Sequence, residues 1–354
     1  MNGEKGIAKL FTVVICVLCL LFSVVACSKQ TPVDSESSSN EVSSSEEEPA
    51  EDEVSSSDET SKDAEGLILG IALNVMDDYQ NRQLNAFTEA AAARGAEIVS
   101  TSANGNIDQQ ISDVESLVTR GVDGILVNAL DKDGLVPAVE AAVEAGIPVI
   151  EGGYGINSTL VYSVGTRQAH HGELQYEYIA DYLEANPEAN LNICYLWGYG
   201  PTKSGDLARH DAFFELLEKN YPDRYTVLAE KYTDYVVETA ISAVEDWYTA
   251  FPEMNTLICQ NDEMAVAAIN ILEAHGVDMD GIIICGIDGS QAISETYLEA
   301  GTLDMTTYTD LNMACSIKLD YLIQLAKGEL QMTENFYVDD AQSLVTPENY
   351  ADIF

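Results

Sequence analysis

The sequence predicts an α/β fold made of two similar lobes, each a doubly wound parallel sheet. From residue 66 onward, short apolar runs alternate with helical patterns, as expected for a parallel sheet covered on both faces by helices. Several helical patterns end at a glycine, as at Gly95, Gly121 and Gly146, where a left-handed residue can close a helix. The alternation restarts after about residue 150, and residues 66–354 are long enough for two lobes.

In the first half, four predicted strands alternate with three helices. Each strand is a short apolar run bounded by glycine or polar residues. The expected elements are a strand over 67–73, a helix over 81–94, a strand over 96–100, a helix over 107–120, a strand over 124–127, a helix over 135–145 and a strand over 147–150.

In the second half, the same rhythm predicts helices over 176–183, 211–220, 238–251 and 265–275, and strands over 192–197, 225–231, 256–260 and 282–287. Cys194, Cys259 and Cys285 fall in the strands and Cys315 in a helical stretch. Since no Cys-x-x-Cys pair remains after the signal, we expect buried free thiols rather than a zinc site or a disulfide scaffold.

The N-terminus has the pattern of a secretory signal. Lys5 and Lys9 precede an apolar run over 10–25, which ends in Val24-Val25-Ala26-Cys27. This ending resembles a bacterial lipoprotein signal, which implies a signal peptide over 1–26 and a lipid on Cys27 that anchors the chain to the outer face of the cell membrane. The alternative is an ordinary signal peptide with a chance cysteine.

Residues 27–65 are expected to form a disordered acidic tether. The segment is rich in Ser, Glu and Asp and lacks aromatic residues, so it cannot bury enough apolar surface to offset its ordering entropy. Residues 28–65 hold thirteen acids and two lysines, a net charge of −11, whereas the whole chain carries −44. The folded part is therefore itself acidic, which argues against nucleic acid as a partner and favours a neutral or cationic small molecule. The alternative is that the charge serves solubility.

Polar and aromatic residues follow the ends of several predicted strands. Ligands of open α/β sheets bind beyond these carboxyl ends, which can face one another across a cleft when there are two lobes. The residues are Asn74, Asp77, Asp78, Tyr79, Asn261, Asp262 and Asp288 after strands, with Arg209 and Tyr235 in later connections. Hydrogen-bonding side chains beside flat tyrosine faces suit a polyol with C–H faces and O–H edges, such as a sugar.

Each of these residues also has an ordinary structural alternative. Asp262 suits a helix N-cap, Asp288 a turn, Tyr79 the surface and Arg209 an exposed helix start. Their shared placement after successive strands favours a binding site over the separate structural roles.

Several stretches resemble the type 1 periplasmic sugar-binding proteins of ABC transporters, with the ribose- and galactose-binding proteins closest in pattern. The stretches are 95–97, 121–128, 145–150, 260–265 and 286–289, and the resemblance spans about 67–328. It implies two lobes joined by a three-strand hinge, with a ligand cleft between them. The implied lobes are 66–166 plus 310–333, and 167–309 plus 334–354.

The resemblance also implies a function and individual contacts. It predicts a monomer that delivers a sugar or related polyol to an ABC permease, without a cofactor. In the family, an acid and an aromatic residue follow the first strand, an arginine and a second aromatic residue come from the second half, and an amide, an acid and a hinge residue complete the site. The matching positions here are Asp77, Tyr79, Arg209, Tyr235, Asn261, Asp288 and Thr309 or Asp310.

One segment departs from the family pattern. Many sugar binders carry Asp-Arg or Asp-Asn after the fourth strand, but this chain continues with Glu151-Gly152-Gly153-Tyr154. The missing pair argues against ribose, and we expect Glu151, Tyr154 or Arg167 to take its place.

The sequence gives no support for metal or catalytic chemistry. His170 and His171 precede Glu173, but no third ligand follows at metal spacing. No nucleophile elbow, phosphate loop or paired general acid and base is evident, so neither an enzyme nor a metal site is expected.

The sequence is also compatible with two other roles. A sensor subunit that signals to a membrane kinase would use the same fold, and a secreted glycan-acting enzyme would need a carboxylate pair. Transcription regulators share the fold, but here a signal stands where their DNA-binding helices would be.

Overall fold

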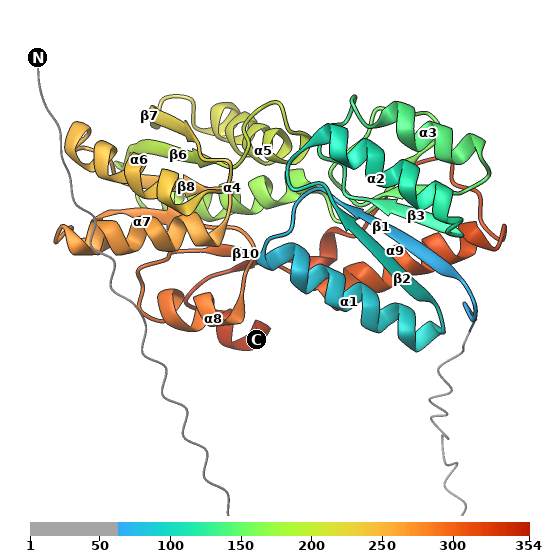
Figure 1. Cartoon of the computed structure of the whole chain (residues 1–354). Helices are drawn as coiled ribbons and strands as arrows, with labels where there is room; N and C mark the ends of the chain where they lie inside the picture. The colour runs from blue at the N-terminus through green and yellow to red at the C-terminus, as the bar shows by residue number, and fades with distance from the viewer. Residues whose placement is uncertain (1–62) are drawn as a thin grey trace, which may run out of the picture. The chain divides into compact units, whose positions relative to one another are not determined.

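The computed structural model describes residues 63–354, so the predicted signal, Cys27 and most of the tether lie outside the described residues. Figure 1 shows the predicted α/β architecture, with a parallel sheet in each of two lobes. The predicted fold class is therefore confirmed.

The first lobe contains a six-stranded parallel sheet in the order β11-β5-β4-β3-β1-β2. Its strands are β1 (Ile68–Leu73), β2 (Glu97–Ser102), β3 (Gly124–Val127), β4 (Val149–Glu151), β5 (Tyr162–Gly165) and β11 (Phe336–Tyr337). The central strand β3 is fully buried, as expected for an apolar strand covered on both faces.

Four helices cover this sheet, two on each face. They are α1 (Asp78–Arg94), α2 (Ile107–Arg120), α3 (Val136–Glu144) and α9 (Leu311–Ala326). Phe87 of α1 and Leu319 of α9 belong to one core cluster, whereas Leu117 of α2 and Val139 of α3 belong to another. The separate clusters place the helix pairs on opposite faces, which makes the sheet doubly wound.

The second lobe repeats this arrangement around a four-stranded parallel sheet in the order β7-β6-β8-β9. Its strands are β6 (Leu191–Trp197), β7 (Tyr225–Tyr232), β8 (Thr256–Cys259) and β9 (Ile283–Cys285), and its helices are α4 (Gln168–Ala185), α5 (Ser204–Asn220), α6 (Val237–Ala250) and α7 (Asp262–Ala274). Phe213 of α5 packs in one core and Trp247 of α6 in the other.

Short elements complete the fold. They are α8 (Gln291–Ile293), α10 (Tyr350–Ile353), η1 (Met279–Gly281), η2 (Ser294–Leu298), η3 (Asp339–Ala341) and the antiparallel pair β10 (Thr306–Thr309) and β12 (Gln342–Val345). The four cysteines of the described part are free and buried, as predicted.

The chain passes between the lobes after β5, after β10 and after β11. The predicted domain boundary at residue 333 differs from the structure, because Phe336 and Tyr337 pair with Val164 and Gly165 at the edge of the first sheet. Edge pairing by two residues leaves almost no apolar signal in the sequence, which explains the difference.

Two helices of the second lobe begin earlier than the sequence predicts. Helix α4 starts at residue 168 rather than 176, and α5 at 204 rather than 211. The added turns carry buried polar residues, among them Gln168, His171, Asp206 and Arg209. Because these helix starts are buried against polar partners rather than an apolar core, the apolar periodicity used to predict helices is interrupted there.

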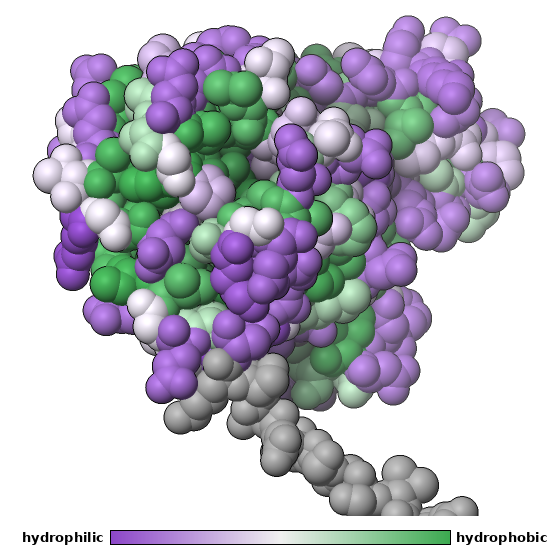
Figure 2. Space-filling view, turned by 90° about the vertical axis from the view of Figure 1, so that its right-hand side faces the viewer, coloured by the Kyte–Doolittle hydropathy of each residue, from purple (hydrophilic) through white to green (hydrophobic). Residues whose placement is uncertain are grey.

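Among residues 63–354, no helix combines the length and the apolar character needed to cross a membrane. The face of the molecule shown in Figure 2 carries mainly hydrophilic side chains with hydrophobic ones between them, which is usual for a protein surface in water.

Candidate functional site

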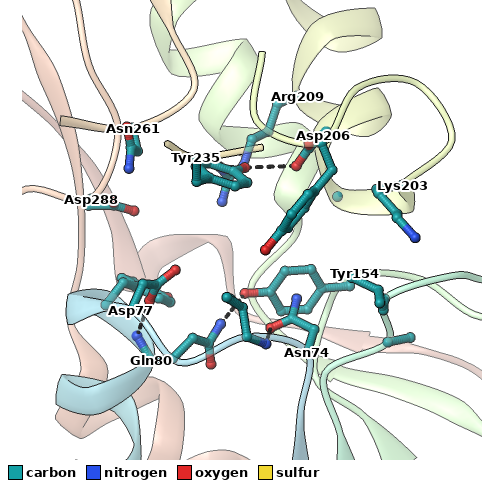
Figure 3. A pocket seen from close by; sticks show the side chains of 16 residues that line it. Asn74, Asp77, Gln80, Tyr154, Lys203, Asp206, Arg209, Tyr235, Asn261 and Asp288 are labelled. Carbon is teal, nitrogen blue, oxygen red and sulfur yellow. Dashed lines mark hydrogen bonds between the residues drawn. The ribbon is translucent and has the colours of Figure 1, made fainter. Parts of the chain in front are cut away.

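A cavity lies where the carboxyl ends of the strands of both lobes meet (Figure 3). It contains about 520 Å³ of space not filled by protein atoms, part of which is open to solvent. Its walls are Asn74, Val75, Asp77, Tyr79, Gln80, Ala129, Leu130 and Tyr154 from the first lobe and Tyr199, Lys203, Gly205, Asp206, Arg209, Tyr235, Asn261 and Asp288 from the second. We call this space the inner cavity.

Two wall residues of the inner cavity are also helix N-caps. Asp77 Oδ1 accepts a 2.7 Å hydrogen bond from the Gln80 amide at the start of α1, and Asn261 Oδ1 accepts a 3.0 Å bond from the Met264 amide at the start of α7. Capping uses one oxygen of each side chain and thereby fixes its direction. The second oxygen of Asp77 and the amide nitrogen of Asn261 remain for a ligand.

Arg209 is held by three acceptors of the second lobe. Its Nε donates to Gln168 Oε1 at 2.9 Å, and its Nη1 donates to the Gln260 carbonyl at 2.8 Å and to the Tyr235 hydroxyl at 3.3 Å. The Tyr235 hydroxyl in turn donates to Asp206 at 2.7 Å, and Figure 3 shows this bond above the cavity. The network fixes the guanidinium plane before a ligand enters.

The charge of Arg209 is stabilised despite its burial. Burial alone would lower the pKa of the guanidinium, but Tyr235, Asp288 and Asp206 act in the opposite direction and raise it above its usual range. Burial also raises the pKa of Tyr79, Tyr154 and Tyr235. Arg209 therefore stays cationic among neutral phenols that can donate hydrogen bonds, and Lys203 is a second cationic side chain in the same wall.

A chain of amides positions Tyr154. Asn128 Nδ2 donates to Gln80 Oε1 at 3.0 Å, and Gln80 Nε2 donates to the Tyr154 hydroxyl at 2.8 Å. The buried Asn128 also donates to Gln83 Oε1 at 2.6 Å. Because each amide is fixed by the next, the Tyr154 ring has a defined place in the wall.

The backbone before α6 places Tyr235 in the cavity. Asp234 and Tyr235 adopt φ values of 54° and 58°, a conformation that costs non-glycine residues free energy and that often marks functional sites. The Tyr235 ring then lies so close to Gly198 that a Cβ there would be 2.0 Å from ring atoms. Glycine at position 198 is therefore required for this placement of the ring.

Asp288 also lies on strained backbone, with φ of 115°. Its carboxyl group has no hydrogen-bond donor among residues 63–354. Burial raises its pKa well above the usual range, Asp262 adds to the rise, and Arg209 opposes it. The group is thus an acceptor that the described part of the chain leaves available for a ligand.

Further donors of buried residues also lack a partner in the described part of the chain. Asn74, Arg209 and Asn261 are each 7% exposed, and no hydrogen bond is formed by Asn74 Nδ2, Arg209 Nη2 or Asn261 Nδ2. Buried polar groups are normally satisfied. Three unpaired donors opposite free carboxylate oxygens therefore fit a ligand with several hydroxyl groups.

Contacts between the lobes surround this cavity. The Lys132 amide of the first lobe donates to Ser204 Oγ at the start of α5, at 3.0 Å. Tyr199 of the second lobe packs on Gly105 of the first, where a Cβ would lie 3.1 Å from the tyrosine hydroxyl. Both contacts join loops next to the site. They form only when the two lobes lie close together, which is also the condition for the cavity to form.

Eight of the predicted site residues line the inner cavity, namely Asn74, Asp77, Tyr79, Tyr154, Arg209, Tyr235, Asn261 and Asp288. Two others, Asp78 and Asp262, line an adjoining space instead. Asp78 pairs with Arg82 at 3.0 Å. Asp262 accepts bonds from the Gly289 amide and the Thr306 hydroxyl at 3.0 and 2.7 Å, so it supports the turn that carries Asp288.

Glu151, Arg167 and Thr309, which the sequence also predicts as site residues, line neither the inner cavity nor the adjoining space. Glu151 is fully buried and accepts from three backbone amides, at 153, 154 and 155, and from Ser163 Oγ. Arg167 pairs with Glu173 and Asp339 at 2.8 and 2.7 Å, beside the crossings between the lobes. Thr309 is buried in β10, paired with Gln342.

The sequence does not predict four polar or aromatic wall residues, namely Gln80, Tyr199, Lys203 and Asp206. Tyr199 lies two residues after the end of strand β6, so the rule that found Asp77 after β1 would also have found Tyr199. Gln80 and Asp206 lie in the first turn of helices, and the sequence carries no signal that these turns face a cavity.

Within residues 63–354, no group of His, Cys, Asp and Glu is arranged to hold a metal ion. His170 pairs with Glu173 at 2.8 Å, and the buried His171 contacts Thr307 Oγ1 and Gln342 Nε2 at 2.6 and 2.8 Å. Both histidines thus have structural partners.

The buried carboxyl of Asp262 predicts a pH dependence of stability. Burial raises its pKa from 3.8 to about 7, so the native state holds this proton more tightly than the unfolded chain. Its contribution to stability is full below the unfolded pKa and is lost as the pH rises to about 7. We expect the Tm difference between parent and Asp262→Asn to fall between pH 4 and pH 8, with the exposed Asp108→Asn as control. A difference that stays constant or rises would contradict the prediction.

Fold and site together define a two-lobed α/β protein that encloses a polar small molecule between its lobes. Residues 69–330 match the family model described as a periplasmic binding protein domain, and the chain belongs to this family. Its relatives are solute-binding proteins and not enzymes, as the sequence predicts.

Three similar proteins bind sugars or polyols. A xylitol-binding protein of Mycolicibacterium smegmatis is 28% identical over 82% of this chain and 80% of its own length. A solute-binding protein of an ABC transporter from Bacillus halodurans, solved with myo-inositol, is 26% identical with a TM-score of 0.72 and covers 82% of this chain and 98% of the other. The fructose-binding periplasmic domain of a hybrid two-component system shares the fold at 20% identity and a TM-score of 0.71, over 81% of this chain and 93% of the other.

Proposed function

We propose that this protein captures a sugar or cyclic polyol outside the cytoplasm and delivers it, as a monomer, to an ABC permease. The observation that carries the proposal is the inner cavity, where buried unpaired donors face free carboxylate oxygens between tyrosine rings. A polyol hydroxyl both donates and accepts a hydrogen bond, and its ring carbons pack on aromatic faces. One such ligand satisfies groups of both lobes at once.

Two relatives support polyols as the ligand class. Xylitol and myo-inositol, the ligands named for these two proteins, carry a hydroxyl on every carbon. The absence of the Asp-Arg pair after β4 supports a ligand other than ribose. Here Tyr154 stands in the cavity wall, and Glu151 holds the loop that carries it.

A sensing role is the alternative to transport. The fructose-binding domain of the two-component system shares the fold, and a sensor would use the same ligand site. Genes for a permease and an ATPase beside this gene would support transport, whereas a kinase gene would support sensing.

A ligand screen tests the binding function directly. We expect one or more inositols, pentitols, pentoses or hexoses to raise the Tm of the protein by several degrees, because a ligand that binds only the native state stabilises it by mass action. Differential scanning fluorimetry with each compound at about 1,000 times its Kd should show a stabilisation of about 4 kcal/mol. If no polyol or sugar shifts the Tm, the proposed ligand class is wrong.

The second part of the proposal is a lipid anchor on Cys27, which lies outside the described residues. It is supported by the sequence Val24-Val25-Ala26-Cys27 and the polar segment that follows. We expect Cys27→Ser to release the protein from the membrane or to leave it unprocessed. Metabolic labelling with a fatty-acid analogue and membrane fractionation measure this, with Cys315→Ser as a control that keeps the label. Unchanged labelling of the Cys27 variant would contradict the anchor.

A further inference from the structure

A second space adjoins the inner cavity and shares four wall residues with it, namely Asp77, Tyr79, Asn261 and Asp288. We call it the outer cavity. It contains about 940 Å³ of space not filled by protein atoms, part of which is open to solvent, and it lies between the starts of α1 and α7 and the segment 290–293. Because the same four side chains border both spaces, a substituent that extends past them from the inner cavity reaches the outer one.

The outer cavity has a large excess of negative charge. Five carboxyl groups line it, namely Asp77, Asp78, Asp262, Glu263 and Asp288, against one guanidinium, that of Arg82. Arg82 is already engaged: it pairs with Asp78 at 3.0 Å and lies over the Tyr79 ring with 5.7 Å to the centroid. Asp78 therefore balances most of the positive charge of Arg82.

Two of these carboxyl groups, those of Glu263 and Asp288, accept no hydrogen bond from any residue in the range 63–354. Burial raises the pKa of Glu263, and the nearby charges of Asp77 and Asp78 raise it further. Burial and Asp262 do the same for Asp288. Repulsion between partly desolvated carboxylates is a cost that a bound cation would relieve.

A second observation indicates a ligand here. Asn261 is 7% exposed, and its Nδ2 has no partner among the described residues. Figure 3 shows Asn261 above Asp288 and Asp288 above Asp77 on one side of the pocket, with the carboxyl groups of the two acids directed into it. This donor and these acceptors converge where the inner and outer cavities join.

We propose that the ligand is a polyol or sugar that carries a protonated amino group, and that its ammonium group lies where the cavities join, between Asp77, Asp288 and Glu263. An ammonium has three donors and a full positive charge, so it can pair with carboxylates of both lobes. The uncharged hydroxyls then occupy the inner cavity, with Arg209 on the opposite side. This inference rests on the proposed function and narrows its ligand class.

The competing explanation is that the acids serve the helices alone. Asp78 and Glu263 lie in the first turns of α1 and α7, where negative charge offsets the helix dipole. If the acids serve the helices alone, an amine compound should bind no more tightly than the compound that has a hydroxyl in place of the amine. The two explanations therefore predict different affinities.

The test compares matched ligand pairs by calorimetry on the full chain in detergent at pH 7. The pairs are glucosamine and glucose, galactosamine and galactose, scyllo-inosamine and scyllo-inositol, and 1-amino-1-deoxyxylitol and xylitol. We expect the amine of at least one pair to bind at least tenfold more tightly than its hydroxyl partner. If every pair that binds shows equal or weaker binding of the amine, the inference is overturned while the polyol function stands. If no compound binds, both are overturned.

A charge-neutralising variant locates the ammonium group. Glu263→Gln should weaken binding of the preferred amine about tenfold and leave its hydroxyl partner unchanged, because a single carboxylate charge is lost without loss of a hydrogen bond to the fold. Glu273→Gln, at the other end of the same helix and outside the lining of the outer cavity, should change neither. An amine preference that is the same in parent, Glu263→Gln and Asp288→Asn would overturn this placement.

Discussion

Arg209→Ala is expected to weaken ligand binding roughly thirty- to a thousandfold, corresponding to about 2–4 kcal/mol. The guanidinium is 7% exposed and fixed by Gln168, Gln260 and Tyr235, so it is preorganised for a ligand. Its removal eliminates charge-assisted bonds to ligand hydroxyls and leaves Asp206 and Asp288 without the cation that favours their ionised form. Calorimetry with a ligand found in the screen measures the loss.

Two further variants separate this role from a general loss of structure. Arg209→Lys should not restore affinity, since an ammonium lacks the planar fork that bonds Gln168 and Gln260 together. Arg120→Ala, at the exposed end of α2, should bind as the parent does. Affinity of Arg209→Ala within about threefold of the parent, with the far-UV circular dichroism unchanged, would remove Arg209 from the site.

Glu151→Ala is expected to destabilise the protein by on the order of 3–5 kcal/mol. The carboxylate is fully buried and accepts four hydrogen bonds, at 3.0, 2.8 and 2.9 Å from the amides at 153–155 and at 2.6 Å from Ser163. Its removal leaves these donors unpaired. Burial lowers the pKa of Lys318, and the negative charge of Glu151 opposes this shift. Removing Glu151 therefore disfavours the ionised form of the buried lysine.

Because the same loop carries Tyr154, ligand affinity should fall together with stability. Thermal unfolding measures the first effect and calorimetry the second. Glu151→Gln retains one acceptor oxygen and should lie between the parent and Glu151→Ala, while the exposed Glu144→Ala should match the parent. A fall in affinity without a fall in Tm would instead support direct contact between Glu151 and the ligand, which the structure does not show.

Much of the fold could be predicted because its signals are local. A buried parallel strand such as β3 is a continuous apolar run, and helices α1 and α2 end at Gly95 and Gly121 with φ of 83° and 73°. These signals need only neighbouring residues. Where a helix start faces polar partners, as in α4 and α5, the local signal is absent and the predicted helix begins too late.

The site could be predicted where a residue follows a strand, or where the family resemblance indicated it, as for Arg209 in α5. Asp77, Asn261 and Asp288 stand at strand ends, and parallel strands bring those ends together whatever the side chains are. Gln80 and Asp206 reach the same cavity from first helical turns, where direction depends on how each helix is rotated against its sheet. That rotation follows from packing of distant residues, so it cannot be inferred from neighbours in the sequence.

The sequence by itself thus determined the two α/β lobes, the acidic character of the chain and the strand-end residues of the cavity. Tertiary structure alone decided the partners of the charged residues. Arg167 pairs with Asp339, 172 positions away, and Glu151 turns inward to four donors of its own lobe. A buried charge is stable only beside its partners, and when the fold supplies those partners within the protein the charge is no longer available to a ligand.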